Sequence, residues 1–346
     1  MAIAGTRNPV RDRFLTGLAW LVALLMFFPI FWLGLSSIKT EDAATSSIPE
    51  IFPTFNQEYL NDRDQRIADG EEVSTWERMW FKPTGGAYVR LTQSADGFGK
   101  FIFNTVTIAL GATLLGMLLA VPAAYSMAFR TTNWTKDILL WMLSTKMLPA
   151  VGVVVPIYLL FKNYEVPFIV FEWDWEFTSW GIGAIFSDFW TSFTSFRLQG
   201  IEFQKLLDTR TGLIMVLALI NLPILIWILF IFFKEIPKEI LEASRMDGAN
   251  TWGELRQVVL PLAWGGIASC ALLSIIFAWN EAYWTIRLAT KDASGVATMV
   301  NATIQNRDLF AAKLSAASMV AIAPIVVMGW FSQKQLVAGL SFGAVK

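Results

Sequence analysis

A few polar residues lie in apolar stretches of the chain, where they could contact a polar molecule. Lys146 follows a run of apolar residues and is followed by Met147-Leu148-Pro149. Further along the chain, Trp279, Asn280 and Glu281 are consecutive in "AWNEAYW". Aromatic rings can stack on the C–H faces of a carbohydrate, while carboxylates and amides accept hydrogen bonds from its hydroxyl groups. Ionisable groups within a bilayer are costly and indicate function by default. These residues are therefore candidates for a substrate pathway, together with Asn221, which lies near Pro223 in another apolar run.

Each of these residues also has a simpler interpretation. Trp279 and its aromatic neighbours could anchor the end of a membrane span at the lipid interface. Lys146 could extend its ammonium group to the membrane surface or pair with a carboxylate of a partner chain. Asn221 could mark a packing kink next to Pro223. The sequence leaves these alternatives open.

The composition narrows the class of protein. The chain of 346 residues is 55% hydrophobic and 16% charged, with a mean hydropathy of +0.51. A soluble domain carries about 25% charged residues, so these values indicate a membrane protein. There is no histidine and one cysteine, Cys270, which argues against nucleophilic triads and cysteine or histidine metal sites. The formal net charge of −1 does not favour binding to nucleic acid.

The hydropathy pattern predicts an all-α polytopic membrane protein with six transmembrane helices. A helix needs about 20 mostly apolar residues to cross the hydrocarbon core. The apolar run that follows Arg7, Arg11 and Arg13 is too long for the core of a signal peptide, so we expect an uncleaved first span. The six expected spans are residues 14–36, 101–127, 138–161, 212–233, 263–286 and 314–331.

The arginine-rich start of the chain favours a cytoplasmic N-terminus at residues 1–13, and six spans return the tail at 332–346 to the same side. The long connections 37–100 and 162–211 are then external. The first has the polarity of a small ordered cap or a partly mobile loop. The second contains "VFEWDWEFTSWGIGAIFSDFW", an aromatic, acidic segment that either lies at the membrane interface or docks an external protein. Residues 101–331 form the predicted core domain, in which 234–262 is a cytoplasmic loop.

That loop is longer and more structured than a simple connection requires. Pro237 can open a first short helix, and Gly248 is free to break it. Asn250 or Thr251 can cap a second helix, with Glu254 placed for a capping box. The loop is therefore either a rigid element that transmits movement to the spans or an ordinary interfacial helix.

Residues 241–262 carry a motif that resembles the EAA loop of ATP-binding-cassette (ABC) importer permeases. Glu242-Ala243-Ser244 is followed by Gly248 after three residues and by Leu260-Pro261 near the end of the loop. Ser244 replaces an alanine and Val258 an isoleucine of the usual pattern. The resemblance implies a coupling helix that docks on a cytoplasmic ATPase. It assigns coupling to Glu242, Ala243, Ser244, Asp247, Gly248, Ala249, Leu260 and Pro261.

The resemblance covers residues 101–346 and the first span. It implies the type I importer fold and the carbohydrate branch of these permeases. "LWMLSTKMLPAVGVVVPIYLLF" and "WNEAYW" are similar to permeases for polyols and small sugars. The implied partners are two cytoplasmic ATP-binding subunits, a second homologous permease chain, an external solute-binding protein and the carbohydrate itself. The resemblance also implies a bacterial cytoplasmic membrane.

The sequence contains neither a P-loop nor a Gly-x-Gly-x-x-Gly motif. We therefore expect no cofactor and no metal on this chain, and no enzymatic activity of its own, with ATP and Mg²⁺ bound by partner subunits. The alternative is a secondary transporter driven by an ion gradient. Such proteins commonly use internal repeats and intramembrane acidic or histidine residues, for which Glu281 alone is a thin basis. A membrane-embedded enzyme would need paired catalytic acids, which the spans lack.

Overall fold

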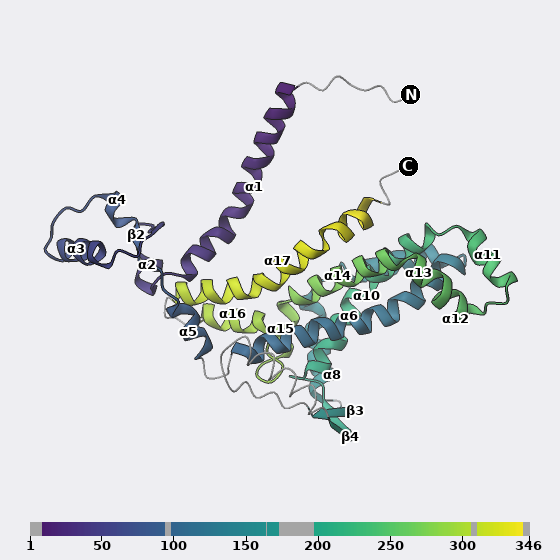
Figure 1. Cartoon of the computed structure of the whole chain (residues 1–346). Coiled ribbons are helices and arrows are strands. Elements are labelled where there is room, and N and C mark those ends of the chain that lie inside the picture. The colour runs from purple at the N-terminus through teal and green to yellow at the C-terminus, as the bar shows by residue number, and fades with distance from the viewer. Residues whose placement is uncertain (1–8, 94–97, 164, 173–196, 306–309, 342–346) are drawn as a thin grey trace. The chain divides into compact units, whose positions relative to one another are not determined.

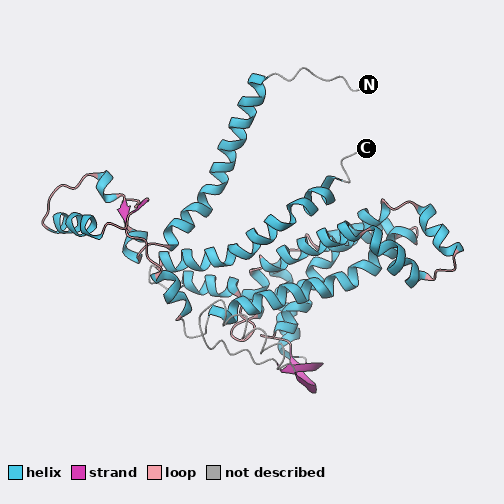
Figure 2. Cartoon of the chain, viewed as in Figure 1, coloured by secondary structure: helices cyan, strands magenta, loops and turns pink. Residues whose placement is uncertain are grey.

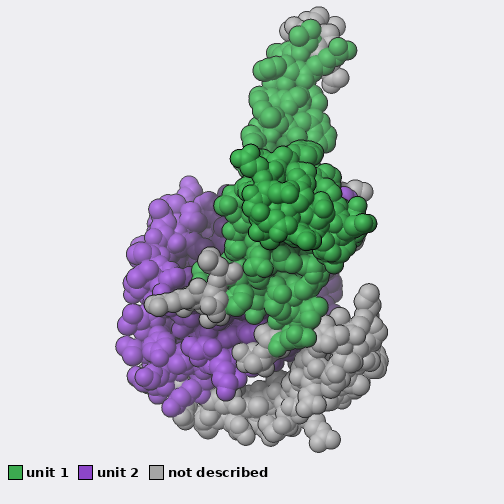
Figure 3. Space-filling view, turned by 90° about the vertical axis from the view of Figure 1, so that its left-hand side faces the viewer, with its two compact units in different colours: residues 1–94, 303–323 green, residues 95–302, 324–346 purple. Residues whose placement is uncertain are grey.

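The computed structural model describes residues 9–93, 98–163, 165–172, 197–305 and 310–341. The chain divides into two compact units, coloured separately in Figure 3. Unit 1 comprises residues 1–94 and 303–323, and unit 2 comprises residues 95–302 and 324–346. The long C-terminal helix α17 (Ala311–Ser341) contributes to both units.

Unit 1 combines a long apolar helix with a set of short elements. Helix α1 (Pro9–Ser37) is followed by α2 (Glu41–Thr45), α3 (Gln57–Ala68), α4 (Thr75–Arg78) and α5 (Gly86–Thr92). Strands β1 (Phe52–Pro53) and β2 (Trp80–Phe81) pair in parallel, with Phe52 opposite Trp80. The connection expected at 37–100 thus contains regular structure, drawn at the purple end of the colour scale in Figure 1.

Buried charged side chains organise these short elements. Arg63 of α3 donates to the backbone carbonyls of Glu77 and Trp80. Lys39 is 2% exposed, and its ammonium nitrogen lies 5.0 Å from the centre of the Trp32 ring and 5.2 Å from that of Phe81. Burial lowers the pKa of Lys39, although the Glu50 carboxylate opposes this shift. Cation–π contacts and hydrogen bonds to backbone carbonyls therefore help to stabilise these short elements, whose hydrophobic core is small.

Unit 2 contains most of the remaining helices, shown in cyan in Figure 2. They are α6 (Phe98–Phe129), α7 (Thr135–Thr145), α8 (Ala150–Asn163), α10 (Arg210–Lys234), α14 (Trp264–Trp279), α15 (Tyr283–Leu288) and α16 (Val296–Gln305), whose last residues belong to unit 1. Between α10 and α14 lie the short segments α11 (Lys238–Met246), α12 (Thr251–Gly253), the π-helical η1 (Glu254–Val259) and α13 (Leu260–Leu262).

Helices α6, α10 and α14 pack against one another and form the centre of unit 2. Glycines allow two of these contacts. A β-carbon at Gly111 of α6 would lie 2.6 Å from the Ile214 side chain of α10, and one at Gly266 of α14 would lie 2.6 Å from the Phe232 ring. Small residues of this kind let membrane helices approach closely. A buried hydrogen bond of 3.1 Å from the hydroxyl of Thr113 to that of Ser274 also joins α6 to α14.

Among the described residues, four helices are long and apolar enough to cross a membrane, or up to six if each of two bent pairs is one span. The predicted first, second, fourth and sixth spans correspond to α1, α6, α10 and α17. The expected third span, 138–161, is divided between α7 and α8, which meet at 87°. The fifth span also differs from the prediction. Its helix α14 ends at Trp279 instead of Ile286, and it meets the preceding helical segment at 82°.

The second long connection, predicted at 162–211, departs from an all-α fold. Strands β3 (Glu165–Glu172) and β4 (Arg197–Lys205) form an antiparallel pair, with Glu165 opposite Lys205 and a register shift between Val170 and Phe171. Most of the aromatic, acidic segment predicted for the interface or for docking lies at 173–196, outside the described residues. Helix α17 continues to Ser341, so much of the predicted tail at 332–346 is helical.

Candidate functional site

Lys146 and Asn221, which are 75 residues apart in the chain, are in direct contact. The ammonium nitrogen of Lys146 lies 3.0 Å from the Asn221 side-chain oxygen and 3.0 Å from the Ile220 backbone oxygen, and it donates to both. Lys146 caps the C-terminus of α7 at the bend before α8, whereas Asn221 is 5% exposed within α10. Pro223 lacks an N–H group and disturbs the helical hydrogen bonds around this position. Polar acceptors are therefore available to the lysine in the middle of an apolar helix.

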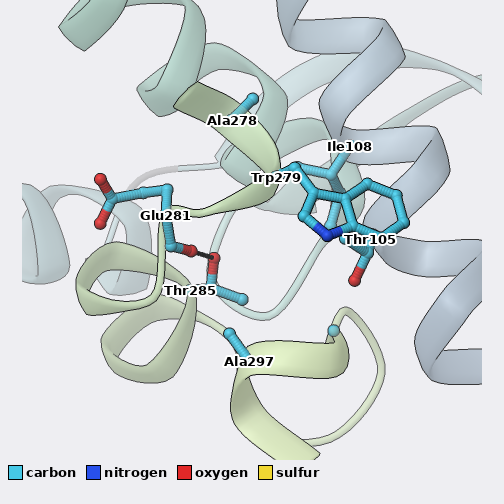
Figure 4. Close-up of a pocket in the computed structure, with 8 residues that line it drawn as sticks. Thr105, Ile108, Ala278, Trp279, Glu281, Thr285 and Ala297 are labelled. Carbon is cyan, nitrogen blue, oxygen red and sulfur yellow. Dashed lines mark hydrogen bonds between the residues drawn. The ribbon is translucent and has the colours of Figure 1, made fainter. Parts of the chain in front are cut away.

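Glu281 lies in the break between α14 and α15 and lines a small pocket of unit 2, drawn in Figure 4. One carboxylate oxygen accepts a hydrogen bond from the Trp284 backbone N–H at 3.3 Å. The hydroxyl of Thr285 donates to the Glu281 backbone oxygen at 2.8 Å. Of the five residues predicted for a pathway, Lys146 and Asn221 are thus in direct contact, and Glu281 lies in the break that follows α14.

Trp279 and Asn280 differ from each other in burial and in their contacts. The Trp279 side chain is 9% exposed and belongs to the hydrophobic core around α6 and α10. The exposed Asn280 donates its side-chain amide to the Ile276 backbone oxygen of its own helix. In Figure 4 the Glu281 carboxylate points away from the Trp279 ring. Trp279 and Glu281 nevertheless line the same small pocket, whereas Asn280 is not among its lining residues, and substrate contact by all three stays a prediction.

The predicted coupling element, residues 241–262, lies within the segment Lys238–Leu262, which contains two helical parts separated at a glycine. This longer segment is called the coupling element below. Helix α11 ends before Gly248, whose φ of +87° lies in the left-handed region that favours glycine. Asn250 caps the second part, because its side-chain oxygen accepts from the Gly253 backbone N–H at 2.7 Å. The predicted capping box is wrong. Gly253 occupies the third helical position, one residue before Glu254, and the Glu254 side chain turns back to α11 instead.

Glu254 is the buried polar centre of this element. Its side chain is 1% exposed, and its two oxygens accept hydrogen bonds from the Arg245 guanidinium at 3.0 and 2.9 Å. Arg130, after the end of α6, donates to the Thr251 hydroxyl. Leu241, Leu255 and Val259 join the hydrophobic cluster formed by α6, α10 and α14. The element is therefore held to the spans by apolar packing and internally by a two-bonded ion pair, as a rigid part requires.

The residues assigned to coupling by the motif lie mostly at the surface of the chain. Glu242, Ala243, Asp247 and Gly248 are exposed, and Ser244 is half-buried with its hydroxyl donating to the Leu241 backbone oxygen at 2.8 Å. Ala249 and Leu260 are half-buried, and Pro261 is exposed. Large apolar side chains accompany them, since Met246 is 88% and Trp252 is 65% exposed. Such exposed apolar side chains next to charged residues are typical of an interaction surface.

At the other end of α10, the structure contains a polar cluster that sequence reasoning missed. The Asp208 carboxylate accepts hydrogen bonds from the backbone N–H groups of Thr290, Lys291, Asp292 and Ala293, and from the Thr290 hydroxyl. The Asn104 amide, 0% exposed, donates to the backbone oxygens of Asp292 and Ser294 at 2.9 and 2.7 Å. An asparagine near the start of an apolar span was a signal that could have revealed one half of this cluster.

None of the described residues forms a group of acidic, histidine or cysteine ligands suited to a metal ion. The geometry of the described residues positions the exposed segment Lys238–Leu262 against apolar helices and places a lysine and an asparagine in contact near the middle of one of them.

Comparison with known proteins identifies the family. Residues 112–340 match the family described as binding-protein-dependent transport system inner membrane component. The chain belongs to this family. The predicted resemblance to ABC importer permeases is thereby confirmed, and the family does not favour the secondary transporter.

Individual permeases show how far the similarity extends. The chain is 24% identical to a probable ABC transporter permease protein of Sinorhizobium fredii, covering 100% of both proteins. It is 28% identical to the trehalose transport system permease protein of Mycobacterium tuberculosis, covering 72% of this chain and 78% of that protein. A crystal structure of a bacterial ABC transporter involved in the import of the acidic polysaccharide alginate contains a similar chain, with a TM-score of 0.63 and 18% identity. That match covers 96% of this chain and 99% of the other, and it shows the shared fold.

Proposed function

We propose that this chain is a transmembrane permease subunit of an ATP-driven, binding-protein-dependent importer of a carbohydrate, either a sugar or a polyol. Family membership supports the importer. The trehalose permease among its relatives supports a carbohydrate substrate. The single observation that carries the mechanism is the exposed, internally bonded element Lys238–Leu262, packed onto the ends of three apolar helices.

In this mechanism, the coupling element docks on a partner ATPase and passes its movement to the spans. Glu242 and Asp247 supply polar contacts at its surface, and the small Ala243, Gly248 and Ala249 allow close approach. The ion pair inside the element keeps it rigid, so that a movement of the ATPase is passed on to the spans and is not lost in a flexible loop. A two-state element biased from both sides is the physical requirement for such coupling.

The spans then alternate between an outward-open and an inward-open arrangement. The Lys146–Asn221 pair in the middle of α10 and the Glu281 carboxylate offer hydrogen-bond donors and acceptors to a polyhydroxylated substrate. The bend between α7 and α8 and the bend between residues 251–262 and α14 are the places where these spans can change direction.

The complete importer also contains two ATP-binding subunits with Mg²⁺, a second permease and an external solute-binding protein. Both termini and the coupling element of this chain lie on the cytoplasmic side of a bacterial inner membrane. The arginine-rich start of the chain and the basic residues at 234–256 support this orientation.

A pull-down from native membranes tests the proposal. The tagged chain is purified in mild detergent and assayed for co-purifying ATPase activity and for a second permease, in parallel with Gly248→Asp. We expect the wild type to bring both partners and the variant to lose the ATPase while still inserting in the membrane. A wild-type chain that purifies alone and supports uptake in vesicles without ATP would overturn the proposal in favour of a secondary transporter.

A further inference from the structure

Three aromatic side chains from β1, α4 and β2 form a cluster in unit 1. The Phe52 ring centre lies 4.9 Å from that of Trp76 and 5.3 Å from that of Trp80, and the two indole rings meet edge to face at 6.3 Å. Phe52 and Trp80 are half-buried, whereas Trp76 is 57% exposed. Phe81, the next residue of β2, is 1% exposed, since successive strand residues face opposite sides. Exposed apolar surface of this kind commonly marks an interaction site, and the cluster therefore calls for a partner.

The sequence and the burial of α1 indicate where this helix leaves the hydrocarbon core of a membrane. Its apolar run begins at Phe14, directly after Arg13. About 20 residues cross the core, so the opposite boundary falls near Trp32. The exposure of the side chains changes at the same place. Nearly all side chains of residues 10–31 are exposed, whereas those of residues 32–37 are buried or half-buried. Contacts of α1 with the rest of unit 1 therefore begin near the membrane surface.

Lys39 links the aromatic cluster to this boundary. Its ammonium nitrogen lies 5.0 Å from the centre of the Trp32 ring and 5.2 Å from that of Phe81. Strand β2 is therefore next to the last turns of α1, at the level of the lipid headgroups, which extend about 5–7 Å beyond the hydrocarbon core. Tryptophan is enriched at this level because its ring is apolar and its N–H group is polar. Helix α3 has the opposite character, since the side chains of Asp62 and Asp64 are 70% and 62% exposed.

We propose that Phe52, Trp76 and Trp80 anchor residues 38–93 in the lipid headgroup layer beside the C-terminal end of α1. The exposed Trp76 supplies the ring that enters the layer, and the other two rings support it by their contacts. The acidic helix α3 stays in water. Aromatic rings also stack on carbohydrates, but the link through Lys39 to the end of a span favours lipid. The inference needs only that α1 spans a membrane, so it is tested separately from the importer.

Quenching of a fluorescent label by lipid tests the anchor. The full chain with Cys270→Ala is labelled at Thr75→Cys, an exposed position next to Trp76, or at Asp62→Cys on α3 as the control. Each labelled chain is inserted in phosphatidylcholine vesicles that carry a nitroxide on the lipid headgroup. We expect severalfold stronger quenching at position 75 than at position 62. Equal quenching would overturn the anchor. If the label at position 75 instead responds to added trehalose without being quenched, the rings bind sugar and the lipid assignment is wrong.

Two variants of Trp76 separate anchoring from packing within unit 1. Trp76→Ser should lower the ratio of docked to undocked chains about tenfold, the effect of withdrawing one large apolar side chain from lipid. Quenching at position 75 then falls towards that at position 62. Tyrosine also favours the membrane interface, so Trp76→Tyr should retain strong quenching. Loss of quenching in both variants would contradict the anchor and leave Trp76 with a packing role alone.

Discussion

Two carboxylates at opposite ends of α10 are stabilised in different ways. Asp208 directly precedes Thr209, the N-cap of the helix, and Glu254 belongs to the element that follows its C-terminus. The 25 residues of α10 separate these ends by about 37 Å. Asp208 is held by backbone N–H groups of one loop, whereas Glu254 is held by an arginine side chain.

The difference indicates which end can move. Backbone donors in a loop cannot change rotamer, so the Asp208 end behaves as a fixed clip that ties the start of α10 to residues 290–293. An arginine side chain can follow its carboxylate through a displacement. We infer that the coupling end of unit 2 is built for two positions and the Asp208 end for one.

Asp208→Ala should have the largest effect on stability. The variant leaves four N–H groups, that of the buried Ala293 and those of three exposed residues, without their charged acceptor. It also places alanine at a φ of 59°, which costs about 1–2 kcal/mol by itself. We expect a total loss of about 3 kcal/mol, measured as a lowered midpoint in thermal unfolding of the detergent-purified chain. Asp208→Asn retains a residue that tolerates this backbone angle and should lose less. Equal losses of thermal stability in the two variants would show that the negative charge of Asp208, and not the backbone angle, is responsible for its contribution.

The same clip should weaken in acid. Burial raises the pKa of Asp208, but the N–H donors of residues 290–293 outweigh it, so the pKa lies below its ordinary value of 3.8. A group with a lowered folded-state pKa contributes its full stability above the unfolded pKa and loses it as the pH falls through the folded pKa. The difference in unfolding midpoint between wild type and Asp208→Asn should therefore be constant from pH 7 to 5 and shrink below pH 3.8. A constant difference down to pH 3 would contradict this assignment.

Gly248→Val should have the next largest effect, at the movable end. A β-branched residue at a φ of +87° is strained by about 2 kcal/mol, enough to shift the angle between α11 and η1. No atom lies within 4 Å of a β-carbon built at this position, so the effect should come from the backbone and not from a clash. We expect uptake per ATP hydrolysed to fall by more than tenfold, with normal membrane insertion. Asparagine tolerates the left-handed region, so Gly248→Asn should retain most of the uptake per ATP hydrolysed. If both variants lose this coupling equally, the docking surface requires a small residue at position 248 and not its backbone angle.

The sequence predicted the coupling element better than the Asp208 clip for a physical reason. The element depends on local rules, namely a proline before α11, a glycine at positive φ and an asparagine cap, all of which act within a few residues. The clip joins Asp208 to a loop more than 80 residues away, and no local pattern announces such a contact. The Glu254 capping box was predicted from spacing alone and is wrong because a tertiary ion pair with Arg245 competes for the same carboxylate.

Prediction of the spans from the sequence was limited in the same way. Hydropathy located all six apolar stretches, since it depends on composition over about 20 residues. It could not reveal the bends at 87° and 82°, because apolar residues on both sides of a break read as one continuous run. The contact between Lys146 and Asn221 was likewise invisible, although each residue was noticed separately as a polar group in an apolar helix.

Lys146→Met tests the region between the two ends of α10. If the ammonium group contacts the substrate, its loss should lower uptake about tenfold, the equivalent of one charged hydrogen bond. Basal ATPase activity of the assembled complex should not change. Lys136→Met, at the exposed start of the same helix α7, is the matched control. Normal uptake by Lys146→Met would leave the lysine as a structural partner of Asn221.

Asn250→Ala should have the smallest effect and shows whether the movable end needs its helix cap. The variant removes the acceptor of the Gly253 N–H, and the loss of such a cap costs about 1 kcal/mol. Hydrogen exchange at residues 251–254 should therefore be about fivefold faster, while exchange at α11 stays unchanged because the Arg245–Glu254 ion pair remains. Asn250→Ser keeps an acceptor and should restore slow exchange. If exchange accelerates across the whole of 238–262 instead, the cap and the ion pair form one cooperative unit, and the coupling element moves as a single rigid body.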